Sequence, residues 1–217
     1  PTTSMFSLSL NHQHDEWQEL APGFNYHGRN TYALLLAKYG HSSTPAGPVP
    51  TFDFVTIQLY EGYSHTQYQL RVKGVSLDMH LETLVKALSD GWDVGFFEVT
   101  EVEMASSRVS VPPTQLVLGL ANGWAGAADG KFLLIFPEEL QETHAKLIEL
   151  GLQPRGYAFW NIADESAVPS GRTADPTWKD SHGGVFMARG LNRFLTVRVN
   201  DAVQCAENIE ERYSVPA

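Results

Sequence analysis

Three nearly uninterrupted apolar runs constrain the fold of this chain more than any other feature. They cover residues 52–60 (FDFVTIQLY), 115–120 (QLVLGL) and 157–162 (YAFWNI). Short runs of this kind, without strict alternation of apolar and polar residues, are typical of strands that are buried on both faces. In parallel sheets both faces of such strands are covered by other parts of the fold. The sequence therefore predicts a parallel sheet at the centre of the fold.

Helical patterns alternate with these strands. Apolar residues recur three and four positions apart in four segments, and the chain is expected to turn at Gly40, Gly91 and Gly151 after the first three of them. Residues 5–10 are expected to form a further short strand at the start of the chain. The segments are marked by Tyr32, Leu35, Leu36 and Tyr39, by Leu81, Leu84, Val85 and Leu88, by Leu140, Leu147 and Ile148 after Pro137, and by Val185, Ala188, Leu191 and Leu195.

This alternation indicates about four βα units, which is half of the eight that close a (β/α)8 barrel. Residues 42–50, rich in Ser, Thr, Pro and Gly, are expected to form a loop. A strand at 96–102 would lie outside the main sheet, and the tail would add a strand at 196–199 and a short helix at 205–212. The length of 217 residues fits a single domain over residues 1–217.

Charge and composition narrow the class of partner. The net charge of −10 argues against nucleic acid and anionic membranes as binding partners, because both would repel such a surface. It is compatible with a neutral polysaccharide as the substrate. No apolar run is long enough to predict a membrane span. The chain opens at Pro1 without a basic and apolar leader, so we expect a processed or excerpted N-terminus, and the question of a signal peptide stays open. The single Cys205 excludes an internal disulfide and says little about compartment.

The strand segments resemble a known family. Three segments are similar, in order and spacing, to the sixth, seventh and eighth barrel strands of family 18 glycoside hydrolases, the chitinases and their lectin-like relatives. These segments are FDFVTIQLYE, QLVLGLANGWAG and RGYAFWNIADE. SMFSLSLNH is then the candidate for the fifth strand. The resemblance covers residues from about 4 to about 195. It implies an α/β fold of the (β/α)8 TIM-barrel type, of which this chain supplies roughly the C-terminal half. It also implies an extracellular or secretory location.

The resemblance assigns roles to residues at the strand ends. The family's sixth strand ends in a motif like Met-x-Tyr-Asp, and here the corresponding residues are Gln58, Tyr60 and Glu61. Trp160 corresponds to the tryptophan that floors the family's sugar site. Barrel active sites lie at the carboxyl ends of the strands. The predicted substrate-binding residues also include three others near strand ends, namely Asn122, Trp124 and Asp164.

In the family the acetamide carbonyl of the substrate attacks the anomeric carbon, a glutamic acid protonates the leaving oxygen, and an aspartate supports the oxazolinium ion. This substrate-assisted reaction is an exception to the usual glycosidase mechanism, in which two carboxylates of the enzyme flank the scissile bond. By resemblance, Tyr60 would donate a hydrogen bond to the acetamide, and Gln58 would contact the same sugar. Glu61 would accept from sugar hydroxyls, although the family's residue there is a shorter Asp. Trp160 would offer its apolar face to the ring.

The acid of this reaction has no counterpart in the sequence. The family signature Asp-x-x-Asp-x-Asp-x-Glu is not matched, and the nearest segment, residues 90–98 (DGWDVGFFE), has the wrong spacing and follows the wrong strand. We attribute that similarity to chance. Hydrolysis by the family mechanism would therefore require the catalytic Asp and Glu from a second or upstream polypeptide that carries the N-terminal half of the barrel.

Simpler interpretations stand beside these roles. Tyr60 and Trp160 could be core aromatics that end buried strands. Gln58 and Asn122 could satisfy backbone groups. Trp124 could stack on a sugar or cap the barrel.

Several polar residues have a simpler explanation too. Glu61, Asp164 and Glu165 could be solvated loop carboxylates. His12 and His14 have no third ligand at a recognisable spacing, so we expect no metal site there. The sequence contains no phosphate-binding loop, no dinucleotide fingerprint and no Gly-x-Ser-x-Gly elbow, and we expect no cofactor.

Three functional hypotheses follow. The first is part of a chitinase-like hydrolase that acts on β-1,4-linked N-acetylglucosamine in chitin, chito-oligosaccharide or an N-glycan core. The second is an inactive chitinase-like lectin that binds N-acetylglucosamine polymers. The third is a structural scaffold barrel without a ligand.

Overall fold

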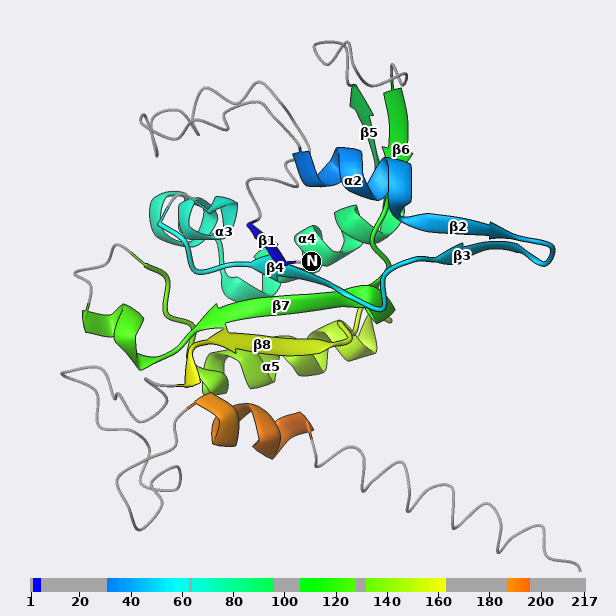
Figure 1. Cartoon of the computed structure of the whole chain (residues 1–217). Helices are drawn as coiled ribbons and strands as arrows, with labels where there is room; N and C mark the ends of the chain where they lie inside the picture. The colour runs from blue at the N-terminus through cyan, green and yellow to red at the C-terminus, as the bar shows by residue number, and fades with distance from the viewer. Residues whose placement is uncertain are drawn as a thin grey trace, which may run out of the picture.

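A four-stranded parallel sheet lies at the centre of the chain in a computed structural model that describes residues 2–4, 31–62, 64–95, 106–127, 132–162 and 187–195. The strands are β1 (Thr2–Ser4), β4 (Val55–Gln58), β7 (Leu116–Ala121) and β8 (Gly156–Trp160). They lie in the order β1-β4-β7-β8, and every neighbouring pair is parallel (Figure 1). The three apolar runs thus form neighbouring parallel strands, as their composition predicts.

The structured strands differ in extent from the predicted ones. β4 begins at Val55 and not at Phe52, and the Phe54 side chain is 47% exposed. The strand predicted at residues 5–10 lies outside the described residues, and β1 precedes it. The segments 96–102, 196–199 and 205–212 also lie outside the described residues.

Helices cover one face of the sheet. The principal ones are α2 (Thr31–Tyr39), α4 (Leu77–Asp90) and α5 (Pro137–Glu149), and residues 187–195 are also helical. In Figure 1, α4 and α5 lie behind the strands. Alternate strand residues point toward them, because side chains of a strand alternate between its two faces. This buried apolar face of the sheet comprises Val55, Ile57, Leu59, Leu116, Leu118 and Leu120, with Tyr157 and Phe159 partly buried.

Local sequence signals explain where the helices begin and end. Pro137 occupies the first turn of α5, where its missing N–H leaves no bond unmade. The backbone N–H of Phe136 donates to Glu139 Oε2 at 2.9 Å, which closes half of a capping box. α4 ends at Gly91, whose φ of 78° and ψ of 163° place it in a region open almost only to glycine.

The prediction of a loop at residues 42–50 is wrong. Strands β2 (His41–Thr44) and β3 (Gly47–Pro50) form an antiparallel hairpin that projects from the body of the chain (Figure 1). Its register pairs Pro48 with Ser43 and Pro50 with His41. With a two-residue turn these are the pairs that exchange no backbone hydrogen bonds, so the missing proline N–H groups cost nothing. The composition therefore predicts a loop, but the prolines of this segment are compatible with an antiparallel hairpin.

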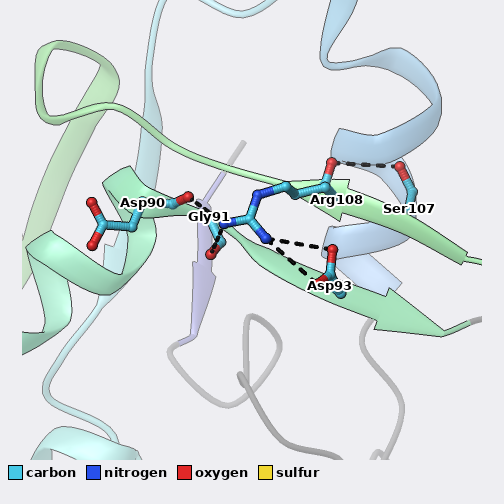
Figure 2. A network of polar contacts seen from close by, with 5 residues as sticks. All are labelled: Asp90, Gly91, Asp93, Ser107 and Arg108. Atoms are coloured by element: carbon cyan, nitrogen blue, oxygen red, sulfur yellow. Dashed lines mark hydrogen bonds and ion pairs between the residues drawn. The ribbon is translucent and has the colours of Figure 1, made fainter.

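A second antiparallel ribbon, β5 (Trp92–Gly95) with β6 (Ser106–Val109), follows α4. Arg108 connects it to the end of that helix (Figure 2). The Arg108 guanidinium donates to the carbonyl oxygens of Asp90 at 2.8 Å and Gly91 at 3.1 Å, and it lies 3.5 Å from the Asp93 carboxylate. These contacts supply partners to helix carbonyls that have none within the helix.

The sheet as described is open, with β1 and β8 as its outer strands. Sequential parallel strands with helices between them are compatible with half of a (β/α)8 barrel, and the complete barrel stays a prediction. A search of the same described segments finds no helix with the length and apolarity needed to cross a membrane.

Candidate functional site

The carboxyl end of the sheet brings two of the predicted residues to one level. Gln58 of β4 pairs with Gly119 of β7, and Ala121 of β7 pairs with Trp160 of β8. The pairing of β4 continues beyond Gln58, because the Leu59 N–H donates to the Gly119 carbonyl at 2.9 Å. Tyr60, two residues after Gln58, therefore falls opposite Ala121, on the same face as Trp160. A small alanine separates the two aromatic positions.

This second face of the sheet differs from the helix-covered one. Between Tyr60 and the amino end its β4 and β7 positions are small or polar apart from Val117, and the exposed Ala158 and Trp160 lie on its β8 side. Gly119 allows close approach here, since a Cβ at that position would lie 3.0 Å from the Ile57 carbonyl oxygen. The other residues of this second face are Thr56, Gln58, Val117, Ala121 and Gly156, as their alternation and register place them.

Tyr60 belongs to an aromatic cluster at the strand end. Its side chain is 6% exposed and packs with Ala121 and Ala125. The Trp124 ring meets it edge to face at 6.0 Å between centroids, and Phe132 meets Trp124 at 4.9 Å. The Leu133 N–H donates to the Tyr60 carbonyl at 2.9 Å. Tyr60 is thus held from several sides.

Trp160 is the opposite case, because its side chain is 61% exposed while its backbone is firmly bound. The Trp160 carbonyl accepts from the Asn122 N–H at 3.3 Å and from the Trp124 indole N–H. The Asn122 side-chain amide donates to the carbonyl of Asn161. The Trp160–Asn161 peptide bond is cis. Ile162, which follows, is 84% exposed. The end of β8 thus presents an apolar surface to solvent.

The two remaining residues of the sixth-strand motif lie at the same edge. Gln58 is half-buried on the face of Tyr60. Burial raises the pKa of the Glu61 carboxyl. The turn after Glu61 is fixed by Ser64, whose N–H donates to the Glu61 carbonyl and whose hydroxyl donates to the Leu59 carbonyl, both at 2.8 Å. Asp164 lies outside the described residues, as do Glu165, Cys205 and the two N-terminal histidines.

The sequence reasoning missed a buried polar cluster that follows β4. It lies in α3 (His65–Gln67), the π-helical turn η2 (Tyr68–Val72) and α4. The His80 ring, 5% exposed, hydrogen-bonds the Thr66 hydroxyl at 3.0 Å, and the His65 ring lies 5.7 Å away. Burial, with a smaller effect of His65, lowers the pKa of His80 to about 4. No motif signals this cluster in the sequence, since its members are separated by the turn.

Phe132 is the other residue that the sequence reasoning missed. It follows a Gly- and Ala-rich stretch without a strand or helix pattern, so nothing marks it. Within the described part of the chain, no three His, Cys, Asp or Glu side chains lie close enough together to hold a metal ion.

Comparison with known proteins supplies no further assignment. No family model matches the sequence, and no curated protein matches it. The chemistry of the site is therefore read from its own residues. An exposed indole beside small side chains provides a flat apolar surface for a ring, and Gln58 and Glu61, at the end of β4 two strands away, provide polar groups.

Proposed function

We propose that this chain forms one wall of a saccharide-binding cleft in a chitinase-like barrel and acts on β-1,4-linked N-acetylglucosamine. The observation that carries the proposal is the placement of Tyr60 and Trp160 at one level, on one face, at the carboxyl end of parallel strands. The resemblance to family 18 glycoside hydrolases predicts this placement, and in (β/α) barrels ligands bind at that end.

Trp160 would supply most of the binding energy. Its indole is largely exposed, and the less polar face of a pyranose ring can stack on it with little loss of water-bound polar groups. Gln58 and Glu61 would then take the sugar hydroxyls and the acetamide, which favours an amidated sugar over a plain glucan. Tyr60, buried within its cluster, would orient the acetamide as the resemblance implies.

Hydrolysis would require more than these residues. The 217 residues contain no Asp-x-x-Asp-x-Asp-x-Glu motif, so the acid that protonates the leaving oxygen would come from another polypeptide carrying the N-terminal half of the barrel. Substrate-assisted retaining hydrolysis would then proceed at the joint site. The same absence favours a second candidate, a chitinase-like lectin that binds N-acetylglucosamine polymers and does not cut them.

Titration calorimetry with a chito-oligosaccharide tests the proposal. We expect binding by the chain and an affinity about thirtyfold weaker in a Trp160→Ala variant, whereas a glucan oligomer of equal length should bind the unaltered chain more weakly. No heat of binding, for the chain alone or in its native complex, would contradict the proposal and favour a scaffold.

Activity separates the two candidates. The native complex, isolated with any partner polypeptide, is incubated with a chito-oligosaccharide and with an N-glycan core. Release of shorter sugars identifies the hydrolase and its substrate, and binding without turnover identifies the lectin. The intact mass of that complex shows directly whether a second chain is present.

A further inference from the structure

The loop that follows β7 donates three hydrogen bonds to backbone carbonyls at the end of β8. We propose that Asn122 and Trp124 are positioning residues that fix the backbone of Trp160 and so aim its indole, and that neither contacts the saccharide directly. The inference rests on the proposed function for its ligand, and the contacts that support it are independent of that function.

Two donors of the β7 loop converge on one carbonyl of β8. The Trp160 oxygen accepts from the Asn122 backbone N–H at 3.3 Å and from the Trp124 indole N–H. A carbonyl has two lone pairs, so both can bond at once. The Asn122 side-chain amide adds a bond to the next carbonyl, that of Asn161. Two residues of the β7 loop therefore hold two consecutive peptide groups at the end of β8.

The side chains of Asn122 and Trp124 are occupied by contacts within the chain. The Asn122 side chain is 0% exposed. The Trp124 indole N–H is already used on the Trp160 carbonyl, and its ring is engaged edge to face by Tyr60 and Phe132. Trp124 thus connects the aromatic cluster of β4 with the backbone of β8, and Trp160 alone of these aromatic residues is largely exposed.

The place of β8 in the sheet explains why its end needs positioning. β8 is an outer strand of the described sheet, and its only strand neighbour there is β7. An exposed side chain on an outer strand loses more conformational freedom on binding unless its backbone is already fixed. The loop contacts supply that fixation beyond the last ladder pair, Ala121 with Trp160. Binding energy at the indole would therefore depend on residues that the ligand never touches.

A double-mutant cycle distinguishes positioning from contact. Trp124→Phe keeps a ring against Tyr60 and removes the indole donor, and Asn122→Leu removes the amide donor. We expect each to weaken chito-oligosaccharide binding about tenfold, as for loss of a hydrogen bond that orders the site. In a Trp160→Ala background neither should weaken binding further. An undiminished loss in that background would show direct contact with the sugar and overturn the proposal.

A matched control is available at the other end of the sheet. The Gln115 side-chain amide donates to the Phe52 carbonyl at 2.7 Å, so Gln115→Leu deletes the same kind of bond remote from the site. Its saccharide affinity should equal that of the unaltered chain. A tenfold loss there as well would mean that any loosening of the sheet reduces binding, and would contradict a specific role for the β7 loop.

A readout without ligand separates this inference from the proposed function. In fluorotryptophan-labelled protein the Trp160 resonance is assigned by its loss in Trp160→Phe. We expect Trp124→Phe and Asn122→Leu to shift or broaden that resonance, and Gln115→Leu to leave it in place. An unmoved Trp160 resonance in both variants overturns the positioning role even if saccharide binds. A moved resonance in a chain that binds no saccharide upholds positioning and rejects the proposed function.

Discussion

At the carboxyl end of the parallel sheet an exposed Trp160 stands beside a buried aromatic cluster, whereas backbone contacts and capping side chains close the amino end. The Arg155 N–H donates to the carbonyls of Pro113 and Leu116, both at 2.8 Å, and Gln115 reaches the Phe52 carbonyl. A cavity of about 70 Å³ at this end is lined by residues of α2, β4 and β6, Arg108 among them. Its volume admits only water or a very small ligand.

The difference between the two ends is one of accessible chemistry. The amino end uses its polar groups on its own backbone, as Arg108 does at the end of α4 (Figure 2). The carboxyl end leaves an apolar ring in solvent although its backbone is satisfied. In (β/α) barrels the first arrangement contributes stability and the second contributes function. Substitutions at the two ends should therefore separate unfolding from binding.

The largest effect is expected at the amino end. A Gly91→Ala variant would force a side chain into a glycine-only backbone conformation and place its Cβ 2.8 Å from the Val109 carbonyl oxygen. Strain and overlap together should lower the free energy of unfolding by about 3 to 4 kcal/mol. Urea unfolding of the variant and of the unaltered chain measures this difference in the free energy of unfolding.

Gly151→Ala is the matched control for that variant. Gly151 also has a positive φ, of 70°, but its Cβ would meet nothing within 4 Å. Only the backbone penalty remains, about 1 kcal/mol. Equal losses in the two variants would show that the crossing of β6 over Gly91 contributes nothing. Saccharide affinity of the folded protein should be unchanged in both.

The second effect is expected in the buried polar cluster of His80, Thr66 and His65, which follows β4 at the carboxyl end of the sheet. His80 has a folded-state pKa of about 4, below its ordinary value of 6.5. The unfolded chain therefore binds more protons between these values, and stability falls as the pH falls from 6.5 to 4. The full difference amounts to about 3 kcal/mol.

Urea unfolding at pH 7 and pH 4 tests the role of His80. In a His80→Gln variant the loss of stability between the two pH values should be smaller by that amount, whereas His41→Gln, at an exposed position of β2, should keep the full loss. A His80→Gln variant with an unchanged loss would mean that the ring is protonated or exposed in the folded chain.

The sequence predicts the sheet better than it predicts the site. Strands β4 and β7 are found because burial on both faces leaves continuous apolar runs, a signal that each strand carries by itself. The run of β8 is also continuous, although Ala158 and Trp160 on its second face are exposed. Gln58 and Tyr60 can be placed on one face from their spacing alone. That Tyr60 lies level with Trp160 depends on register across three strands, and no local pattern encodes it.

Two failures have physical causes. Proline and serine at residues 42–50 predict a loop because they mark turns, whereas the pairing of the hairpin depends on prolines falling at positions without ladder bonds. The link from Trp124 to Trp160 depends on the 3-10 turn η4 (Gly123–Ala127), which follows β7 directly, and the sequence shows only a Gly-rich stretch there.

Two exposed aromatic residues lie at opposite ends of the sheet. Trp160 is 61% exposed at the carboxyl end, and Phe54 is 47% exposed before β4. Trp160→Ala should weaken saccharide binding about thirtyfold, or about 2 kcal/mol, because a stacking surface is lost. Phe54→Ala should leave affinity unchanged and remove only the contact with Arg155, 6.0 Å from the ring. Calorimetry measures both, and equal losses would abolish the distinction between the ends.

The smallest effect is expected in the helix layer between the two ends. Lys146 of α5 lies 3.0 Å from Asp78 and 3.1 Å from Glu82, both of α4, and all three side chains are well exposed. Exposed ion pairs contribute little to stability, so Lys146→Met should move the urea midpoint less than any change above. The pKa of Asp78, lowered to about 2 by the Ser76 hydroxyl first and then by Lys146, should rise partway toward 3.8.

An NMR titration of the Asp78 carboxyl measures that rise. Its sign also fixes the pH range of any stability change, because a carboxyl with a lowered pKa stabilises the fold above its ordinary value of 3.8 and loses this contribution as the pH falls toward 2. Lys86→Met, which breaks the pair with Asp90 at 2.8 Å within α4, is the control and should leave Asp78 as it is. If the Asp78 pKa stays near 2 without Lys146, the Ser76 hydroxyl accounts for the shift. The ion pair between Lys146 and Asp78 then has no measurable effect on the Asp78 carboxyl.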